Sequence, residues 1–240
     1  AEQRAPGAAR ALTLDTDSGE QRCSPRERTS VAIQLDVASL PAGPMPLLAG
    51  WFGEARGAGL TEPRAMVLST ADPGGAPSAR TVLATVIDDS GVTFHSSHPT
   101  RKTRDLAENP RACAVFGWYD IGAQVVLTGT VERLPAAETD AAFAARPRYL
   151  QLLAWAYERD SDPDDLAGAA AGERDRWGER IPDRPPGWLG FRLRPEVVDF
   201  WRGPVGAGPA AAADTGAGTA HERVRYALGG GSWHLSRELP

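Results

Sequence analysis

Residues 79–96 read ARTVLATVIDDSGVTFHS, and this stretch decides the class of fold. Two runs rich in Val and Thr flank the turn sequence Asp88-Asp89-Ser90-Gly91, which is typical of a β-hairpin. In residues 124–134, QVVLTGTVERL, one set of alternate positions is apolar, as in a strand with one buried face. The same reasoning predicts strands at 65–70, 79–87, 92–96, 112–118, 124–134, 187–193, 197–201, 222–228 and 232–235.

Helices are inserted among these strands. After Pro46, apolar residues such as Leu48, Trp51 and Phe52 recur at helical spacing. Further helical segments are expected at 100–109, with Thr100 as a cap, at 136–157 with a break at Pro147, and at 166–180. Because strands come in hairpins and do not alternate with helices, we expect a mainly β fold with inserted helices (α+β), an antiparallel barrel rather than a Rossmann sheet.

Composition limits the class of protein. The 240 residues carry a formal net charge of −5 without a basic block, which argues against a nucleic-acid or membrane partner. Two cysteines in unrelated surroundings predict neither a disulfide framework nor a zinc site. No apolar run is long enough for a membrane span or a signal peptide, so a cytoplasmic protein is expected. We expect a flexible arm at 1–40, a barrel domain at 41–240, and a Gly/Ala-rich loop inserted at 203–218.

Cations stand at two places where an anion could bind. Arg101 and Lys102 fall in the first turn of the helix expected at 100–109, where the helix dipole disfavours positive charge. The placement makes sense if backbone N–H groups and both side chains converge on an anion, although two solvated surface charges are the alternative. Arg80 begins an apolar strand, so its guanidinium is either at a barrel rim or an ordinary surface cation.

Other strand ends carry weaker signals. Gln124 could aim its amide at a planar ring, or could be satisfied by the backbone. Trp201 ends an apolar strand and is either a core residue or the wall of a ring-binding site. His221 places a titratable ring at the start of the next strand, beside Arg223.

The order of these motifs is more specific than any one of them. Over about residues 46–240 the chain resembles the pyridoxamine 5'-phosphate oxidase family in the sequence of motifs Arg80-Thr81-Val82-Leu83, Ser96 with Thr100-Arg101-Lys102, Glu108-Asn109-Pro110-Arg111, Gln124-Val125, Arg146-Pro147-Arg148, Phe200-Trp201-Arg202-Gly203 and His221-Glu222-Arg223. The resemblance implies an FMN-binding split barrel, assembled as a homodimer with a cofactor in each of two interfacial clefts.

The resemblance also implies which residues bind the cofactor. Arg80, Ser96, Arg101 and Lys102 would hold the flavin phosphate. The full set of cofactor-binding candidates is Arg80, Thr81, Val82, Leu83, Thr85, His95, Ser96, Arg101, Lys102, Gln124, Arg159, Trp201 and Arg223, of which Gln124, Trp201 and Arg223 would flank the ring system. A Gln-Ser pair of the family falls here on Arg159 and Asp160, which is a departure from its pattern.

The substrate side departs further from the family. Positions that hold a Lys, a Tyr, an Arg, a Ser, a second Arg and a His in the vitamer oxidases fall here on Thr85, Ala142, Arg146, Leu150, Thr219 and His221. Hydrogen bonds to charged groups contribute about 1.5–3 kcal/mol each, so two lost cations should weaken phosphate-ester binding by about 10²–10⁴-fold. Vitamin B6 phosphate oxidation therefore becomes an alternative rather than the leading hypothesis.

Residues 62–65, 71–73 and 106–110 are similar to the phenazine-biosynthesis oxidases of the family. We therefore expect an oxidase that moves hydride from a reduced cyclic intermediate of secondary metabolism, a polycyclic small molecule, to flavin N5 and passes the electrons to oxygen. Arg146 and His221 would bind or polarise that substrate. The further alternatives are a reductase of polycyclic products such as tetracyclines that uses an 8-hydroxy-5-deazaflavin coenzyme, and a non-catalytic flavin- or haem-binding module.

Overall fold

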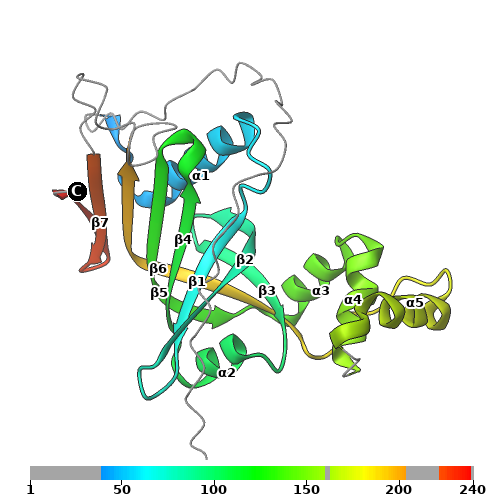
Figure 1. Cartoon of the computed structure of the whole chain (residues 1–240). Coiled ribbons are helices and arrows are strands. Elements are labelled where there is room, and N and C mark those ends of the chain that lie inside the picture. Colours follow the sequence, from blue (N-terminus) through cyan, green and yellow to red (C-terminus); the bar gives the residue numbers. More distant parts are fainter. Residues whose placement is uncertain (1–38, 160–162, 204–221, 239–240) are drawn as a thin grey trace, which may run out of the picture.

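The computed structural model describes residues 39–159, 163–203 and 222–238. Its elements, drawn in Figure 1, are α1 Pro44–Gly57, β1 Ala65–Ala71, β2 Pro77–Asp88, β3 Gly91–Ser97, α2 Arg101–Glu108, β4 Arg111–Trp118, β5 Ala123–Arg133, α3 Ala136–Ala144, α4 Arg148–Glu158, α5 Leu166–Trp177, β6 Trp188–Arg202, β7 Glu222–Gly229 and β8 Ser232–Glu238. Short 3-10 helices occupy Tyr119–Ile121 and Pro163–Asp165.

Six of the strands close into an antiparallel barrel. The strand order is β3-β2-β1-β4-β5-β6, and β3 also pairs with β6, from Val92 opposite Leu193 to Ser97 opposite Trp188. Strands β7 and β8 continue the sheet beyond β6. The α+β antiparallel barrel expected from the hairpin pattern is therefore confirmed.

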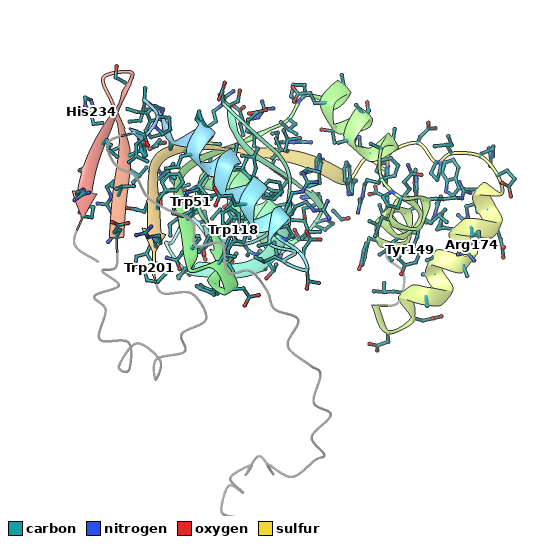
Figure 2. The ribbon with its side chains drawn as sticks, turned by 90° about the horizontal axis from the view of Figure 1, so that it is seen from above. Trp51, Trp118, Tyr149, Arg174, Trp201 and His234 are labelled. Atoms are coloured by element: carbon teal, nitrogen blue, oxygen red, sulfur yellow. The ribbon has the colours of Figure 1, made fainter. Side chains whose placement is uncertain are left out.

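The barrel interior is filled by one face of each strand and by α1. Residues of β5 alternate between buried and half-buried positions, as its sequence predicts. Trp51 of α1 packs edge-on against Phe200, with ring centroids 5.2 Å apart, and both rings are fully buried. Trp118 lies beside this helix and donates its indole N–H to Pro63 O at 2.9 Å (Figure 2). Helix α1 therefore belongs to the core.

Strand β6 is continuous, and the prediction of two strands at 187–193 and 197–201 is wrong. The interruption expected at Pro195 is absorbed by a bulge, because Pro195 faces Gly129 while Val197 faces Thr128, which leaves Glu196 as an extra residue. A Cβ on Gly129 would collide with the Arg194 carbonyl, so only glycine allows this approach. The Glu196 carboxylate accepts hydrogen bonds from Arg111 and Thr130, each at 2.7 Å.

Helices α3–α5 form a lobe on one side of the barrel, and the β7–β8 hairpin lies on the opposite side (Figures 1 and 2). The expected break at Pro147 separates α3 from α4. Arg184 fastens the lobe to the barrel, since it contacts Asp140 at 2.6 Å and donates to Trp188 O at 2.9 Å. No helix in the described ranges has the length and apolar character to cross a membrane. Residues 1–38 and 204–221, which hold nearly all of the expected arm and inserted loop, lie outside those ranges.

Candidate functional site

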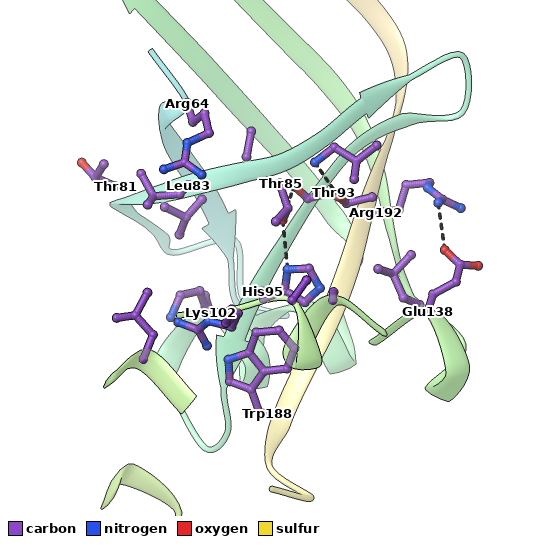
Figure 3. A pocket seen from close by; sticks show the side chains of 18 of the residues that line it. Arg64, Thr81, Leu83, Thr85, Thr93, His95, Lys102, Glu138, Trp188 and Arg192 are labelled. Carbon is purple, nitrogen blue, oxygen red and sulfur yellow. Dashed lines mark hydrogen bonds and ion pairs between the residues drawn. The ribbon is translucent and has the colours of Figure 1, made fainter. Parts of the chain in front are cut away.

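A cavity of about 870 Å³ lies between β2, β3 and the α3–α4 part of the lobe (Figure 3). The structure brings together around it the sequence-predicted residues Arg80, Thr81, Val82, Leu83, Thr85, His95, Lys102 and Arg146. Residues far apart in the sequence therefore share one concave surface. Its two ends differ in chemistry.

The first end is cationic, and the start of α2 forms it. A capping arrangement begins this helix: Thr103 Oγ1 accepts from Thr100 N at 2.9 Å, and Thr103 N donates to Thr100 O at 3.1 Å. Lys102, the second residue of the helix, is half-buried, and its ammonium group donates to Thr100 Oγ1 at 3.3 Å. Burial, followed by the charge of Arg80, lowers the pKa of Lys102. Within the described residues no carboxylate pairs with it.

Arg80 extends from β2 toward the same end. Its Nη1 donates to Thr70 Oγ1 at 2.9 Å and to Leu68 O at 3.2 Å, and its Nη2 donates to Ser78 Oγ at 2.5 Å. Burial lowers the pKa of Arg80; Asp105 opposes this shift, and the charge of Arg101 adds to it. Partly buried cations that repel one another are stabilised by an anion. A phosphate monoester, with three strongly accepting oxygens, has the chemistry that these donors require.

The second end is aromatic. The His95 ring stacks on Trp188 with centroids 4.4 Å apart and planes 5° apart, and the Arg146 guanidinium lies 4.9 Å from a Trp188 ring centroid. Burial lowers the pKa of Arg146, and in the described part of the chain its guanidinium has no carboxylate partner. Apolar side chains complete this end, namely Leu134, Ala142, Ala145, Pro147 and Leu150.

His95 is neutral at this end. Burial, and then the charge of Arg146, lower its pKa from 6.5 to about 4. Thr85 Oγ1 lies 2.9 Å from His95 Nδ1, within hydrogen-bond distance, and 3.3 Å from Thr93 O (Figure 3). The Nε2 atom is buried without a hydrogen-bond partner among the described groups.

Several lining residues were not found from the sequence. Trp188 contacts both the His95 ring and the Arg146 guanidinium. Arg192 lies at the rim of the cavity and forms an ion pair with Glu138 of α3 at 3.1 Å. Arg64 also lines the cavity and pairs with Glu62 at 2.9 Å. A tryptophan at the start of a strand, Trp188, is the sequence signal that could have indicated this end of the cavity. Its partners His95 and Arg146 lie on other elements, so the sequence alone does not show the contacts.

Gln124, Trp201 and Arg223 do not line this cavity. They lie side by side in one row across β5, β6 and β7, because Gln124 pairs with Trp201 and Trp201 pairs with Arg223. Trp201 lies toward the hairpin side, away from the lobe (Figure 2). Arg223 donates to Asp199 Oδ1 at 3.1 Å, and Gln124 Oε1 accepts from Tyr119 OH at 3.4 Å.

The remaining predicted residues have other surroundings. Arg101 is exposed at the first position of α2, beside the cavity rather than in its lining. Ser96 is buried in β3 and donates to Ser97 O at 3.0 Å. Arg159 ends α4 and pairs with Glu173 of α5 at 2.7 Å. His221, together with Thr219 and Asp160, lies outside the described residues.

Comparison with known proteins adds the family. Residues 52–178 match the family model described as pyridoxamine 5'-phosphate oxidase. The chain is also 45% identical over 198 residues to a pyridoxine/pyridoxamine 5'-phosphate oxidase of Salinispora arenicola, which covers 79% of this chain and 83% of the relative. This chain belongs to the pyridoxamine 5'-phosphate oxidase family. The resemblance inferred from the order of motifs is thereby confirmed.

Two further proteins of known sequence or structure are similar to this chain over most of its length. A pyridoxine/pyridoxamine 5'-phosphate oxidase of Thermobifida fusca is 42% identical over 217 residues, which covers 86% of this chain and 92% of the relative. The structure of PhzG from Burkholderia lata 383, in complex with tetrahydrophenazine-1-carboxylic acid, has a TM-score of 0.75 and 28% identity. That match covers 88% of this chain and all of PhzG.

The half-buried, neutral His95 predicts a pH dependence of stability. Its pKa in the folded chain, about 4, lies below the ordinary value of 6.5, so the unfolded chain takes up more protons as the pH falls through this window. The free energy of unfolding should fall accordingly. His95→Phe retains a ring on Trp188 but binds no proton, so its loss of stability should be smaller. Urea denaturation of both proteins near pH 7 and at about pH 4.5 measures the difference; equal losses would contradict the assignment.

Proposed function

We propose that this chain is an FMN-dependent oxidase that dehydrogenates a reduced cyclic small molecule bearing one carboxylate. The observation that carries the proposal is the shared cavity: Arg80 and Lys102 stand at one end, and Arg146 stands on Trp188 at the other. When bound, FMN would supply the redox chemistry, accepting a hydride equivalent from the substrate and passing the electrons to oxygen to give hydrogen peroxide. The residues described here contribute binding, orientation and exclusion of water.

The cationic end suits the cofactor. A flavin phosphate carries nearly two negative charges near pH 7, and Arg80 and Lys102 provide charge-assisted donors, with Arg101 adding its field from the helix start. A bound phosphate would offset the free-energy cost of burying the charged ammonium group, which is the cost that lowers the pKa of Lys102. The rest of the cofactor would contact β2 at Thr81, Val82 and Leu83, which line the cavity.

We further propose a homodimer, since one chain leaves the site incomplete. The β2 wall of the cavity is open, with Leu83 45% and Val86 48% exposed, and neighbouring Val67 of β1 is 42% exposed. The row of Gln124, Trp201 and Arg223 lies away from the cavity of its own chain, so a second copy would bring it to the ring system. Light scattering should give about twice the 25.5 kDa of one chain, and a monomeric mass would contradict the dimer.

The aromatic end suits a carboxylate better than a phosphate. Arg192 at the rim is neutralised by Glu138, whereas Arg146 at this end has no carboxylate partner among the described residues. Thr85, Ala142 and Leu150 around it add no charge. One cation above a planar, apolar surface fits a ring system with a single negative charge. PhzG is known with tetrahydrophenazine-1-carboxylic acid, a ligand of this class.

Oxidation of pyridoxine or pyridoxamine 5'-phosphate is the second candidate. It is favoured by the names of relatives that are 45% and 42% identical to this chain over most of its length. The two candidates differ in the charge that the Arg146 end must hold. Substrate preference therefore separates them.

Flavin retention tests the cofactor. Lys102→Ala and Arg101→Ala should weaken FMN binding, by about 10–100-fold for Lys102 in the cavity wall, because a charge-assisted hydrogen bond is lost. Arg104→Ala, an exposed residue of the same helix outside the cavity lining, is the matched control. Absorbance of the purified proteins and their thermal midpoints are the measurements. Unchanged flavin content in both variants would contradict the site, and activity only with deazaflavin would favour the reductase alternative.

Substrate preference tests the reaction. The FMN-loaded protein should consume oxygen faster with a reduced tricyclic carboxylate than with pyridoxamine 5'-phosphate. Arg146→Gln should raise KM for the carboxylate by about 10–100-fold, since its charge partner is removed. Arg174→Gln, on the exposed surface of α5, is the control. Faster turnover of pyridoxamine 5'-phosphate would instead establish the second candidate.

A further inference from the structure

A carboxylate lies behind the cation cluster, where an anion site would not be expected to hold one. Asp105 is on α2, one turn after Arg101, and is 6% exposed. Its Oδ2 accepts hydrogen bonds from Thr70 Oγ1 at 2.6 Å and Ser78 Oγ at 3.1 Å. Among the described residues no ion pair joins Asp105 to a cation, so its contacts are hydroxyl groups.

The same two hydroxyls are the side-chain acceptors of Arg80. Arg80 Nη1 donates to Thr70 Oγ1 at 2.9 Å, and Nη2 donates to Ser78 Oγ at 2.5 Å. A hydroxyl has one proton and two lone pairs, so a hydroxyl that gives its proton to Asp105 must present lone pairs to the guanidinium. Asp105 thus takes the proton of each hydroxyl and leaves the lone pairs of both oxygens for Arg80.

We call these contacts, from Asp105 through the hydroxyls of Thr70 and Ser78 to Arg80, the relay. Strand pairing brings its residues together. Thr70 of β1 is directly opposite Ser78 of β2, and Arg80 follows two residues later on the same face of β2. Helix α2 supplies Asp105, whose carboxylate contacts both hydroxyls. The carboxylate remains ionised because the hydrogen bond from Thr70, then that from Ser78 and the charges of Arg101 and Arg80, hold its pKa below the ordinary value.

We propose that Asp105 is a positioning residue, which holds the Arg80 guanidinium against the cavity through the hydroxyls of Thr70 and Ser78. The inference rests on the proposed FMN site, because it concerns the affinity of that site for a phosphate group. A role in charge balance alone has the opposite sign: removal of a negative charge from the cluster would then strengthen phosphate binding. The sign of the change therefore decides between the two roles.

FMN and riboflavin, which differ by the phosphate, are the probes. The wild-type protein should bind FMN more tightly than riboflavin. In Asp105→Asn the affinity for FMN should fall by about 10–100-fold while that for riboflavin is unchanged, because the loss is confined to the phosphate contact. In an Arg80→Gln background the same substitution should have no further effect, since Asp105 acts through Arg80.

A second pair of variants leaves Asp105 in place. Thr70→Val removes the relaying hydroxyl with little change of shape, and it should lower the preference for FMN over riboflavin. Thr70→Ser keeps the hydroxyl and should restore most of that preference. Both are needed if Asp105→Asn does not fold.

The outcomes separate the two proposals. A wild-type protein that binds FMN and riboflavin equally would overturn the phosphate site and the relay with it. A wild-type preference for FMN that persists or grows in Asp105→Asn would overturn the relay alone. Equal loss of both flavins in Asp105→Asn, or an additional loss in the Arg80→Gln background, would show that Asp105 acts on the fold instead.

Discussion

The site depends on the repulsion among cations that the fold gathers at the start of α2. Lys102 and Arg80 are both partly buried, and burial lowers the pKa of each. Groups placed in this way are costly for the folded chain unless an anion joins them. The neighbouring carboxylate, Asp105, does not neutralise them by contact, because its oxygen is occupied by the hydroxyls of Thr70 and Ser78. We therefore propose that an anionic ligand completes the cluster.

Strand β6 organises the rest of the site. It begins at Trp188, whose indole contacts His95 and Arg146 at the aromatic end of the cavity. Its other end includes Trp201, near the β7–β8 hairpin. A strand of 15 residues spans too great a distance for both ends to contact one small ligand. The proposed dimer resolves this arrangement, since the far end of β6 would then serve the cavity of the second copy.

Local sequence was sufficient for the hairpins, for α2 with its Thr100 cap, and for the unusual position of Arg101 and Lys102 in the first turn. It was insufficient where a distant residue decides. The continuity of β6 through Pro195 depends on Gly129 across the sheet. The stack of His95 on Trp188 depends on the pairing of β3 with β6, which closes the barrel.

The role of Asp105 cannot be predicted from local sequence for the same reason. The hydroxyl that gives it a role belongs to Thr70, 35 residues earlier. Within its own helix an aspartate after three cations has the pattern of an ordinary charged surface residue. The family resemblance supplied candidate residues such as Gln124 and Arg223, but the geometry of one chain separates them from the cavity.

The ionisation of the bound phosphate measures the central electrostatic claim directly. The second pKa of a free phosphate monoester is about 6, and a cluster of cations should lower it when the phosphate binds. The phosphorus-31 resonance of FMN on the protein should therefore remain at its dianion position between about pH 5 and pH 8. A bound phosphate that titrates near pH 6, as it does in solution, would contradict the account.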